Sequence, residues 1–471
     1  MNRPEAMGAR PIGRLLLEFS IPSIAGMLVS SLYGLVDRIF IGRGIGIDGM
    51  AAVTAAFPVM MIGMAIGLLF AVGARSLASL SLGSGDHAKA EEYLSRATGT
   101  AFLAALAASL LCAVAVDPLL RLFGATPLIL PGARSYLLWV LAGFPLQAAS
   151  MTAGSSLQAQ GKPRLAFLVL LSGTLLNAVL APLFIFACHW GLGGAGAALA
   201  TAQAFSLVLT LALVQSPGSS LKLRASLLLP EPVSAARLAA VGAPIFLVQL
   251  LGCAVMVVAN NAMRPYGGEL GLAVIGIVNT VAMVFGFPLF GLTNGAQPLW
   301  GFNYGAGKWS RISRLSVLVL AWTFALALLS ELGMMLAPES FVRLFASDPA
   351  LVALGSRALR VFMTAFVLFP LGIVPASYFQ STGRPLPAGI LMLSRNLVMM
   401  TAMLVLSRLY GLDGVLWAGP VADTVTGVLG FVYLMKMRSE IGREELGAAL
   451  VAPAASLAEL RENRRLDLES A

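Results

Sequence analysis

Residues 15–36 read LLLEFSIPSIAGMLVSSLYGLV, and Asp37 follows directly. This run is long enough to cross a bilayer, because a hydrocarbon core of about 30 Å requires roughly 20 apolar residues in a helix. An acid at membrane depth costs on the order of 2.5–3.5 kcal/mol, so it usually serves a function. Similar apolar runs with few acids recur along the chain. The pattern therefore predicts a polytopic membrane protein of the transporter class, with Asp37 as the first candidate functional residue.

The composition supports this class. The chain is 58% hydrophobic and 11% charged, with a mean hydropathy of +0.87, whereas soluble domains carry roughly 25% charged residues. The net charge of +9 comes from Lys and Arg residues spread between the apolar segments. Such spacing is typical of membrane topology signals and does not indicate nucleic-acid binding.

Residue types that carry catalysis or bind metals are scarce. Cys112, Cys188 and Cys253 lie far apart, and His87 and His189 fall in predicted loops. We therefore expect no disulfide framework, no metal site, no cofactor and no enzymatic activity. The chain contains no GxxxxGK[ST] loop for ATP, and its first apolar run is too long for a cleavable signal peptide.

The apolar runs predict an all-α fold of twelve transmembrane helices. The expected spans are 14–38, 50–80, 95–117, 134–153, 164–187, 193–215, 237–261, 270–300, 312–336, 353–378, 386–408 and 412–436. We expect six of them in an N-terminal lobe over 1–218 and six in a C-terminal lobe over 237–437. A cytoplasmic linker over 219–236 would join the lobes, and a polar cytoplasmic tail would occupy 438–471.

Positive charges between the spans predict the orientation. With both termini inside, the inner segments carry 17 Lys and Arg residues against 9 in the outer segments, before the distal tail. An excess of positive charge marks the cytoplasmic side. We therefore expect both termini in the cytoplasm.

The two halves of the chain repeat each other at a constant offset of 222 residues. The residues that match include Pro22 and Pro244, Gly49 and Gly271, Gly83 and Gly305, Arg121 and Arg343, Gln158 and Gln380, and Pro163 and Pro385. Each half holds six spans, an even number, so both halves run in the same direction. Parallel repeats of this kind are related by an axis along the membrane normal, with a cavity between the lobes.

Several motifs resemble those of the multidrug and toxic compound extrusion (MATE) family, bacterial type. They are YGLVDRIFIGRGIG, QGKPR and STGRP after the fourth and tenth spans, GLTNGAQPLWGFNYGAGK, and LFGATP with LFASDP. The resemblance covers about residues 12–436. It implies two six-helix lobes that open alternately to either side, and export of organic cations in exchange for protons or sodium.

The resemblance also implies a cation site in the N-terminal lobe. Asp37, Asn177 and Thr201 match three of its positions, but Ala181 stands where the family usually has a second Asp. The loss of one carboxylate favours protons over sodium as the coupling ion, because hard cations require several oxygen ligands. The acids that some members carry in the C-terminal lobe are also missing.

The residues themselves give two interpretations of Asp37. It could be an interfacial acid beside Arg38 and Arg43, where charge costs little. Alternatively, Asp37, Asn177 and Thr201 each lie roughly 10–15 Å below the outer surface at 1.5 Å per residue, so they could converge. Desolvation at that depth would favour the protonated carboxyl and make Asp37 a proton carrier.

Other candidates lie on both lobes. Pro22 and Pro244, near the starts of paired spans, are either tolerated kinks or hinges. Asp423 is either a polar contact between helices, with Thr424 or Thr426, or an acid that contacts the substrate; Arg395 could pair with an acid across the lobe. The remaining candidates for the substrate cavity are Gln249, Asn260, Asn279, Asn294 and Gln380.

The leading hypothesis is a secondary antiporter that exports cationic or amphipathic drugs across the bacterial inner membrane as a monomer, in exchange for protons or sodium. Its partners would be small organic cations and membrane lipids, without nucleic acid or an obligate protein partner. The alternatives are a flippase for lipid-linked sugars, or an exporter of a specific metabolite, within the same wider superfamily. A flippase should show a more cationic cavity, and intramembrane cations are scarce beyond Arg75 and Arg395. A membrane enzyme would need a catalytic cluster of residues, and a scaffold would need a long soluble domain. The sequence shows neither.

Overall fold

The computed structural model describes residues 3–345 and 348–469 of the chain. Within these ranges, the side chains of residues 3–4, 32–39, 43, 47, 260, 264, 267–269, 272 and 447–469 are not described. The predicted site residues Asp37 and Asn260 are among them, so these two predictions lie outside the described residues.

The N-terminal half is entirely helical between its loops. Its elements are α1 (Arg3–Met7), α2 (Ile12–Gly44), α3 (Ile47–Gly83), α4 (His87–Val114), α5 (Val116–Leu122), α6 (Leu130–Ala159), α7 (Pro163–Pro182), a π-helical turn (Leu183–Ala187) and α8 (Gly191–Val214). A loop with one short 3₁₀ turn (Ala225–Leu227) leads into the second half.

The C-terminal half continues in the same way. Its elements are α9 (Pro232–Gly305), α10 (Trp309–Leu336), α11 (Pro338–Val342), α12 (Pro349–Met363), a 3₁₀ turn (Phe366–Leu368), α13 (Phe369–Ser381) and α14 (Pro385–Glu469). Neither half contains a strand over the residues that the structure describes. The predicted all-α fold is therefore confirmed.

The helices agree with the predicted spans, except that two pairs of spans are joined in single elements: 237–261 with 270–300 in α9, and 386–408 with 412–436 in α14. Eleven helical segments within the described ranges are long and apolar enough to cross a membrane. The predicted spans 386–408 and 412–436 form a single segment, Pro385–Leu446. Within it Gly411 has φ +58° and ψ −129°, a conformation that side chains other than glycine rarely adopt, and this residue separates two helices along α14.

Sequence signals explain where several helices begin. Proline occupies one of the first two positions of α7, α9 and α12, where its missing N–H is not needed. The side chain of Asp86 accepts a hydrogen bond from the Lys89 N–H and caps α4. His87, expected in a loop, is therefore the first residue of α4, whereas His189 lies in the turn before α8 with φ +56°.

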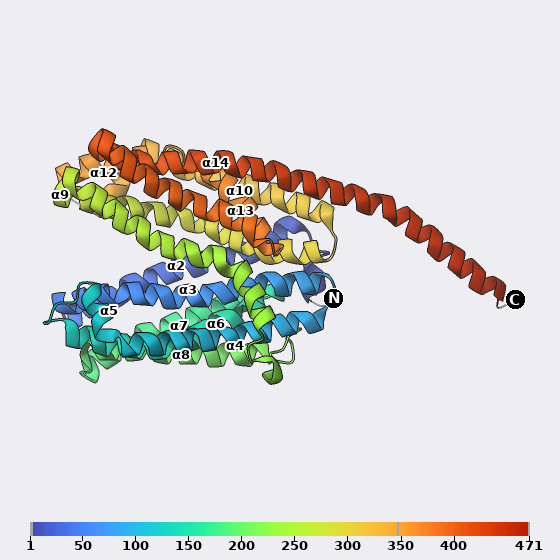
Figure 1. Cartoon of the computed structure of the whole chain (residues 1–471), viewed down its shortest axis with the longest axis horizontal. Helices are drawn as coiled ribbons and strands as arrows, with labels where there is room; N and C mark the ends of the chain where they lie inside the picture. The colour runs from blue at the N-terminus through green and yellow to red at the C-terminus, as the bar shows by residue number, and fades with distance from the viewer. Residues whose placement is uncertain (1–2, 346–347, 470–471) are drawn as a thin grey trace.

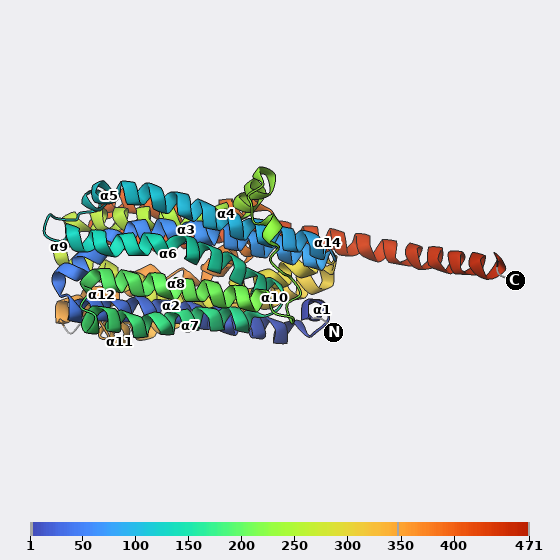
Figure 2. The same cartoon turned by 90° about the horizontal axis from the view of Figure 1, so that it is seen from below.

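The helices form two bundles, one from each half of the chain (Figure 1). Both views place the N-terminus at the end of the bundles from which α14 projects (Figures 1 and 2). We call this the terminal end and the opposite end the far end. The predicted polar tail, 438–471, continues α14 as a helix to Glu469.

The hydrophobic core shows how the two lobes meet. The largest cluster of buried side chains combines both lobes, with Leu16 and Phe19 of α2 packed among Trp300 of α9 and Tyr378 of α13. Another cluster contains only residues 255–422 of the C-terminal half, and a third only residues 41–195 of the N-terminal half. A fourth cluster again combines the lobes, with Leu238 and Val241 of α9 beside Phe70 and Leu77 of α3. Two of the four clusters among the described residues therefore cross between the lobes, and the other two each stay within one lobe.

Candidate functional site

The predicted N-terminal site is partly described. Asn177 of α7 is buried, with 2% of its surface exposed, and so is Ala181 one turn later. Thr201 of α8 is exposed, and its hydroxyl donates to the Ala197 carbonyl oxygen at 2.8 Å. The α7 and α8 helices pack closely, since a Cβ on Gly173 would lie 2.1 Å from the Ser206 Oγ. Whether these residues bind a cation together with Asp37 stays a prediction.

Asp423 lies in a buried ion pair in the C-terminal lobe. Its side chain is 1% exposed, and Oδ1 accepts a hydrogen bond from the Arg395 Nε at 2.6 Å. The Arg395 guanidinium also lies over the Phe369 ring, 4.9 Å from its centroid. The expected pairing of Arg395 with an acid is confirmed. Thr426 donates to the Ala422 carbonyl of its own helix. The Asp423 carboxylate therefore does not bond the Thr426 hydroxyl. It bonds Arg395, which lies on the part of α14 before Gly411.

The other predicted polar residues divide into two groups. Gln249 and Asn279 of α9 are half-buried. Asn294 and Gln380 belong instead to a chain of hydrogen bonds that passes between the lobes, and Gln380 is 1% exposed.

This chain of hydrogen bonds centres on Arg75 of α3. Its Nη1 donates to the Gln158 Oε1 of α6 at 2.8 Å, and its Nη2 donates to the Gln297 Oε1 of α9 and, at 3.5 Å, to the Asn294 Oδ1. Gln297 then donates to the Gln380 Oε1 of α13 at 3.3 Å. We call Arg75, Gln158, Asn294, Gln297 and Gln380 the inter-lobe network.

The inter-lobe network obeys the internal repeat. The offset of 222 residues places Arg75 on Gln297 and Gln158 on Gln380. The hydrogen bonds inside each lobe are therefore equivalent, each joining residues 83 apart, and the Arg75–Gln297 bond joins the two equivalent positions themselves. Sequence analysis noted the matching glutamines but missed the network. The signal was available, because Arg75 and Gln297 are polar residues at equivalent positions in apolar runs.

Two equivalent glycines close the terminal end. A Cβ on Gly83, the last residue of α3, would lie 2.0 Å from the Phe302 carbonyl oxygen of α9. A Cβ on Gly305, the last residue of α9, would lie 2.0 Å from the Leu80 carbonyl oxygen of α3. The repeat offset exchanges these two contacts, so the glycines allow each helix backbone to touch the other. We call this pair of contacts the glycine crossing.

The predicted hinge prolines lie inside helices. Pro22 is half-buried within α2, ten residues after that helix begins. Pro244 is buried within α9, and a Cβ on Gly389 of α14 would lie 3.7 Å from its ring. Both positions therefore lie one or more turns inside a helix and not at its first residue, and the hinge role stays a prediction.

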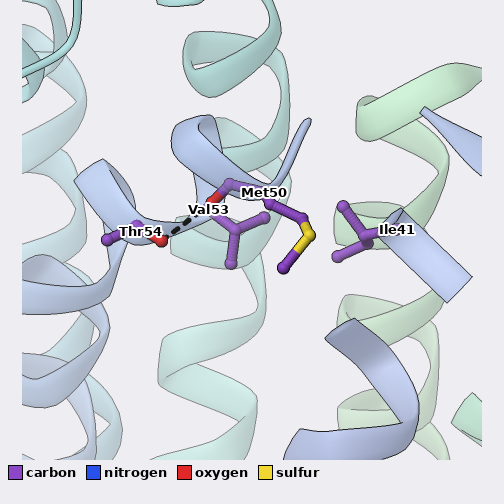
Figure 3. Close-up of a pocket in the computed structure, with 4 residues that line it drawn as sticks. All are labelled: Ile41, Met50, Val53 and Thr54. Atoms are coloured by element: carbon purple, nitrogen blue, oxygen red, sulfur yellow. Dashed lines mark hydrogen bonds between the residues drawn. The ribbon is translucent and has the colours of Figure 1, made fainter. Parts of the chain in front are cut away.

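Two small pockets are present on the N-terminal lobe. Figure 3 shows one of about 30 Å³ near the junction of α2 and α3, lined by Ile41, Met50, Val53 and Thr54, where Thr54 donates to the Met50 carbonyl. The other, of about 340 Å³, is lined by Ser135, Trp139, Trp190 and Gly193. Neither lining contains an ionisable side chain. No group of three His, Cys, Asp or Glu residues suitable for a metal occurs in the described ranges.

The fold and the network define a two-lobed helical bundle of the membrane-transporter type, built from an internal repeat. The chain belongs to the MatE family: the family model matches residues 22–183 and 241–405, one segment in each lobe. The resemblance inferred from the motifs is thereby confirmed.

Curated relatives are similar over nearly the whole chain. Multidrug export protein MepA of Staphylococcus haemolyticus (strain JCSC1435) is 25% identical over 430 residues, which cover 91% of this chain and 95% of that protein. Multidrug export protein MepA of Staphylococcus aureus (strain MRSA252) is 24% identical over 438 residues, covering 93% and 97%.

Solved structures share the fold. An outward-facing multidrug resistance MATE family transporter of the MOP superfamily has a TM-score of 0.85 at 24% identity, with 93% of this chain and 98% of that chain covered. A MATE structure in the bent conformation has a TM-score of 0.86 at 23% identity, with 95% and 99% covered.

Proposed function

We propose that this protein is a secondary active exporter of cationic or amphipathic organic compounds that works by alternating access. The relatives named above as multidrug export proteins support the substrate class. The proposal places the chain in the bacterial inner membrane with both termini in the cytoplasm, so that the terminal end is the inner side. One chain contains both lobes, so a monomer would suffice.

One observation carries the mechanism. The lobes share two clusters of buried side chains and the glycine crossing toward the terminal end, while two further clusters each lie within one lobe. Two rigid lobes joined at one end only can exchange that closure for a closure at the other end. This is the motion that alternating access requires of parallel repeats.

We assign the coupling ion to protons, carried at Asp37. Asn177 and Thr201 would complete the site, and Ala181 supplies no second carboxylate for sodium. Uptake of a proton at Asp37 from the outer side would weaken the binding of a cationic substrate and release it. One proton crossing 100 mV supplies about 2.3 kcal/mol.

The test is ethidium efflux from proteoliposomes that contain the full chain, under an imposed pH gradient and then a sodium gradient. Asp37→Asn is compared with the wild type and with Asp48→Asn, a control acid that is exposed in the first turn of α3. We expect efflux driven by the pH gradient, lost in Asp37→Asn and retained in Asp48→Asn.

The other outcomes separate the parts of the proposal. Efflux by Asp37→Asn at the wild-type rate would exclude Asp37 as the proton carrier. Efflux that follows only the sodium gradient would reassign the coupling ion, and no efflux of any organic cation under either gradient would refute drug export.

A further inference from the structure

Arg75 is a buried cation whose partners are all neutral. Its side chain is 9% exposed, and its Nε has no hydrogen-bond partner among the described residues. The acceptors of its other nitrogens are the amide oxygens of Gln158, Asn294 and Gln297. No salt bridge to Arg75 is found in the part of the chain that the structure describes. A buried guanidinium without a carboxylate is unfavourable, so it requires an explanation.

The closed contact between the lobes does not explain the charge. Arg75 and Gln297 occupy equivalent positions of the repeat, and the bond between them needs one N–H donor and one amide oxygen. A glutamine at position 75 has two N–H groups, so it could bond the Gln158 and Gln297 oxygens without burying a charge. The Gln297–Gln380 bond, which is the repeat equivalent of Arg75–Gln158, is made between two neutral amides. The positive charge must therefore serve another state of the protein.

Separation of the lobes would change the surroundings of Arg75. Asn294 and Gln297 lie on α9, in the opposite lobe, and would leave with it, whereas Gln158 lies on α6 of the same lobe and would stay. The guanidinium would then face the space between the lobes with Nε and Nη2 lacking partners. An exposed guanidinium with free N–H groups binds carboxylates in a bidentate manner.

We propose that Arg75 binds the carboxylate of amphipathic substrates when the terminal end is open, and so sets the affinity of the protein for compounds that carry a carboxylate. This inference rests on the proposed export function. Closure would replace the substrate carboxylate by the amide oxygens of Asn294 and Gln297, which would favour release of the substrate toward the far end.

The experiment uses two dyes that differ in one group. Tetramethylrhodamine carries a free carboxylate, and its methyl ester does not. Transport of both is measured in proteoliposomes with the full-length wild type, Arg75→Gln and Arg75→Lys. We expect Arg75→Gln to raise the KM for the acid about tenfold, the effect of losing one charge-assisted hydrogen bond. The KM for the ester should change less than about twofold, although the lost inter-lobe bonds change the turnover of both dyes alike, and the KM values of Arg75→Lys should lie between.

Transport of the ester also reports that each variant is folded. If Arg75→Gln raises the KM of both dyes equally, or of neither, Arg75 acts only in the contact between the lobes or not at all, and the inference fails. If the wild type carries the ester but not the acid, export stands and the inference fails. If the wild type carries neither dye nor ethidium, the proposed function itself fails.

Discussion

Adding one methyl group at the glycine crossing should force the lobes apart at the terminal end. In Gly83→Ala the new Cβ would lie 2.0 Å from the Phe302 carbonyl oxygen, whereas ordinary contact begins at 3.4 Å. The backbone must therefore move by about 1.4 Å. The contacted atoms belong to the backbone of Phe302 and not to the end of a flexible side chain, so the two helices themselves must shift.

The expected magnitude follows from the cost of overpacking. Extra methyl groups in a well-packed contact cost about 1–3 kcal/mol, which changes the ratio of closed to open protein about 5- to 150-fold. Gly305→Ala should have the same effect through the Leu80 carbonyl oxygen, because the two contacts are equivalent. Gly252→Ala is the matched control, since a Cβ on this α9 glycine meets nothing within 4 Å.

The assay measures access to a buried position beside the crossing. Ser79 of α3 is 0% exposed, so Ser79→Cys is placed in a protein whose three cysteines are replaced by serine. A water-soluble maleimide should label this thiol at least about fivefold faster in Gly83→Ala and Gly305→Ala than in Gly252→Ala. Equal labelling rates in all three variants would refute the reasoning that this contact closes the terminal end.

Two further predictions concern stability and can be checked by thermal unfolding of the purified protein in detergent. Arg395→Gln should lower the free energy of unfolding by about 3–5 kcal/mol, because it leaves the Asp423 carboxylate buried and unpaired. The double variant Arg395→Met with Asp423→Leu should lose less stability, because it removes both charges. An equal loss in the two variants would contradict this account. Asp86→Ala should cost about 1 kcal/mol through the lost cap of α4, while Asp86→Ser keeps the cap and should cost less.

The fold could be predicted from the sequence because its signals are local or repeated. Apolar runs of membrane length, bounded by glycine, proline and charge, gave the helices and their number. The constant offset gave the two lobes, since it matched Gly83 with Gly305 and Gln158 with Gln380. The short helices α5 and α11 escaped prediction because seven and five residues are too few to show a helical period.

The site was less predictable because its contacts join distant parts of the chain. Arg75 meets Gln297 across 222 residues, and the two side chains differ, so a search for identical residues at the repeat offset passed over them. The pairing of Arg395 with Asp423 depends on how two helices rotate against each other, and their sequences do not specify this. Thr201 was expected at a common depth with Asn177, yet it is exposed whereas Asn177 is buried. Depth along a helix does not determine which face a residue occupies.

The bond between Arg75 and Gln297 bears on how such a chain can arise from two copies of a shorter one. In a dimer of identical six-helix chains, the residue at this position would face its own copy across the symmetry axis. Two arginines there would repel each other, whereas two glutamines could bond. A single arginine at this position therefore requires two halves that differ in sequence, which fusion into one chain provides.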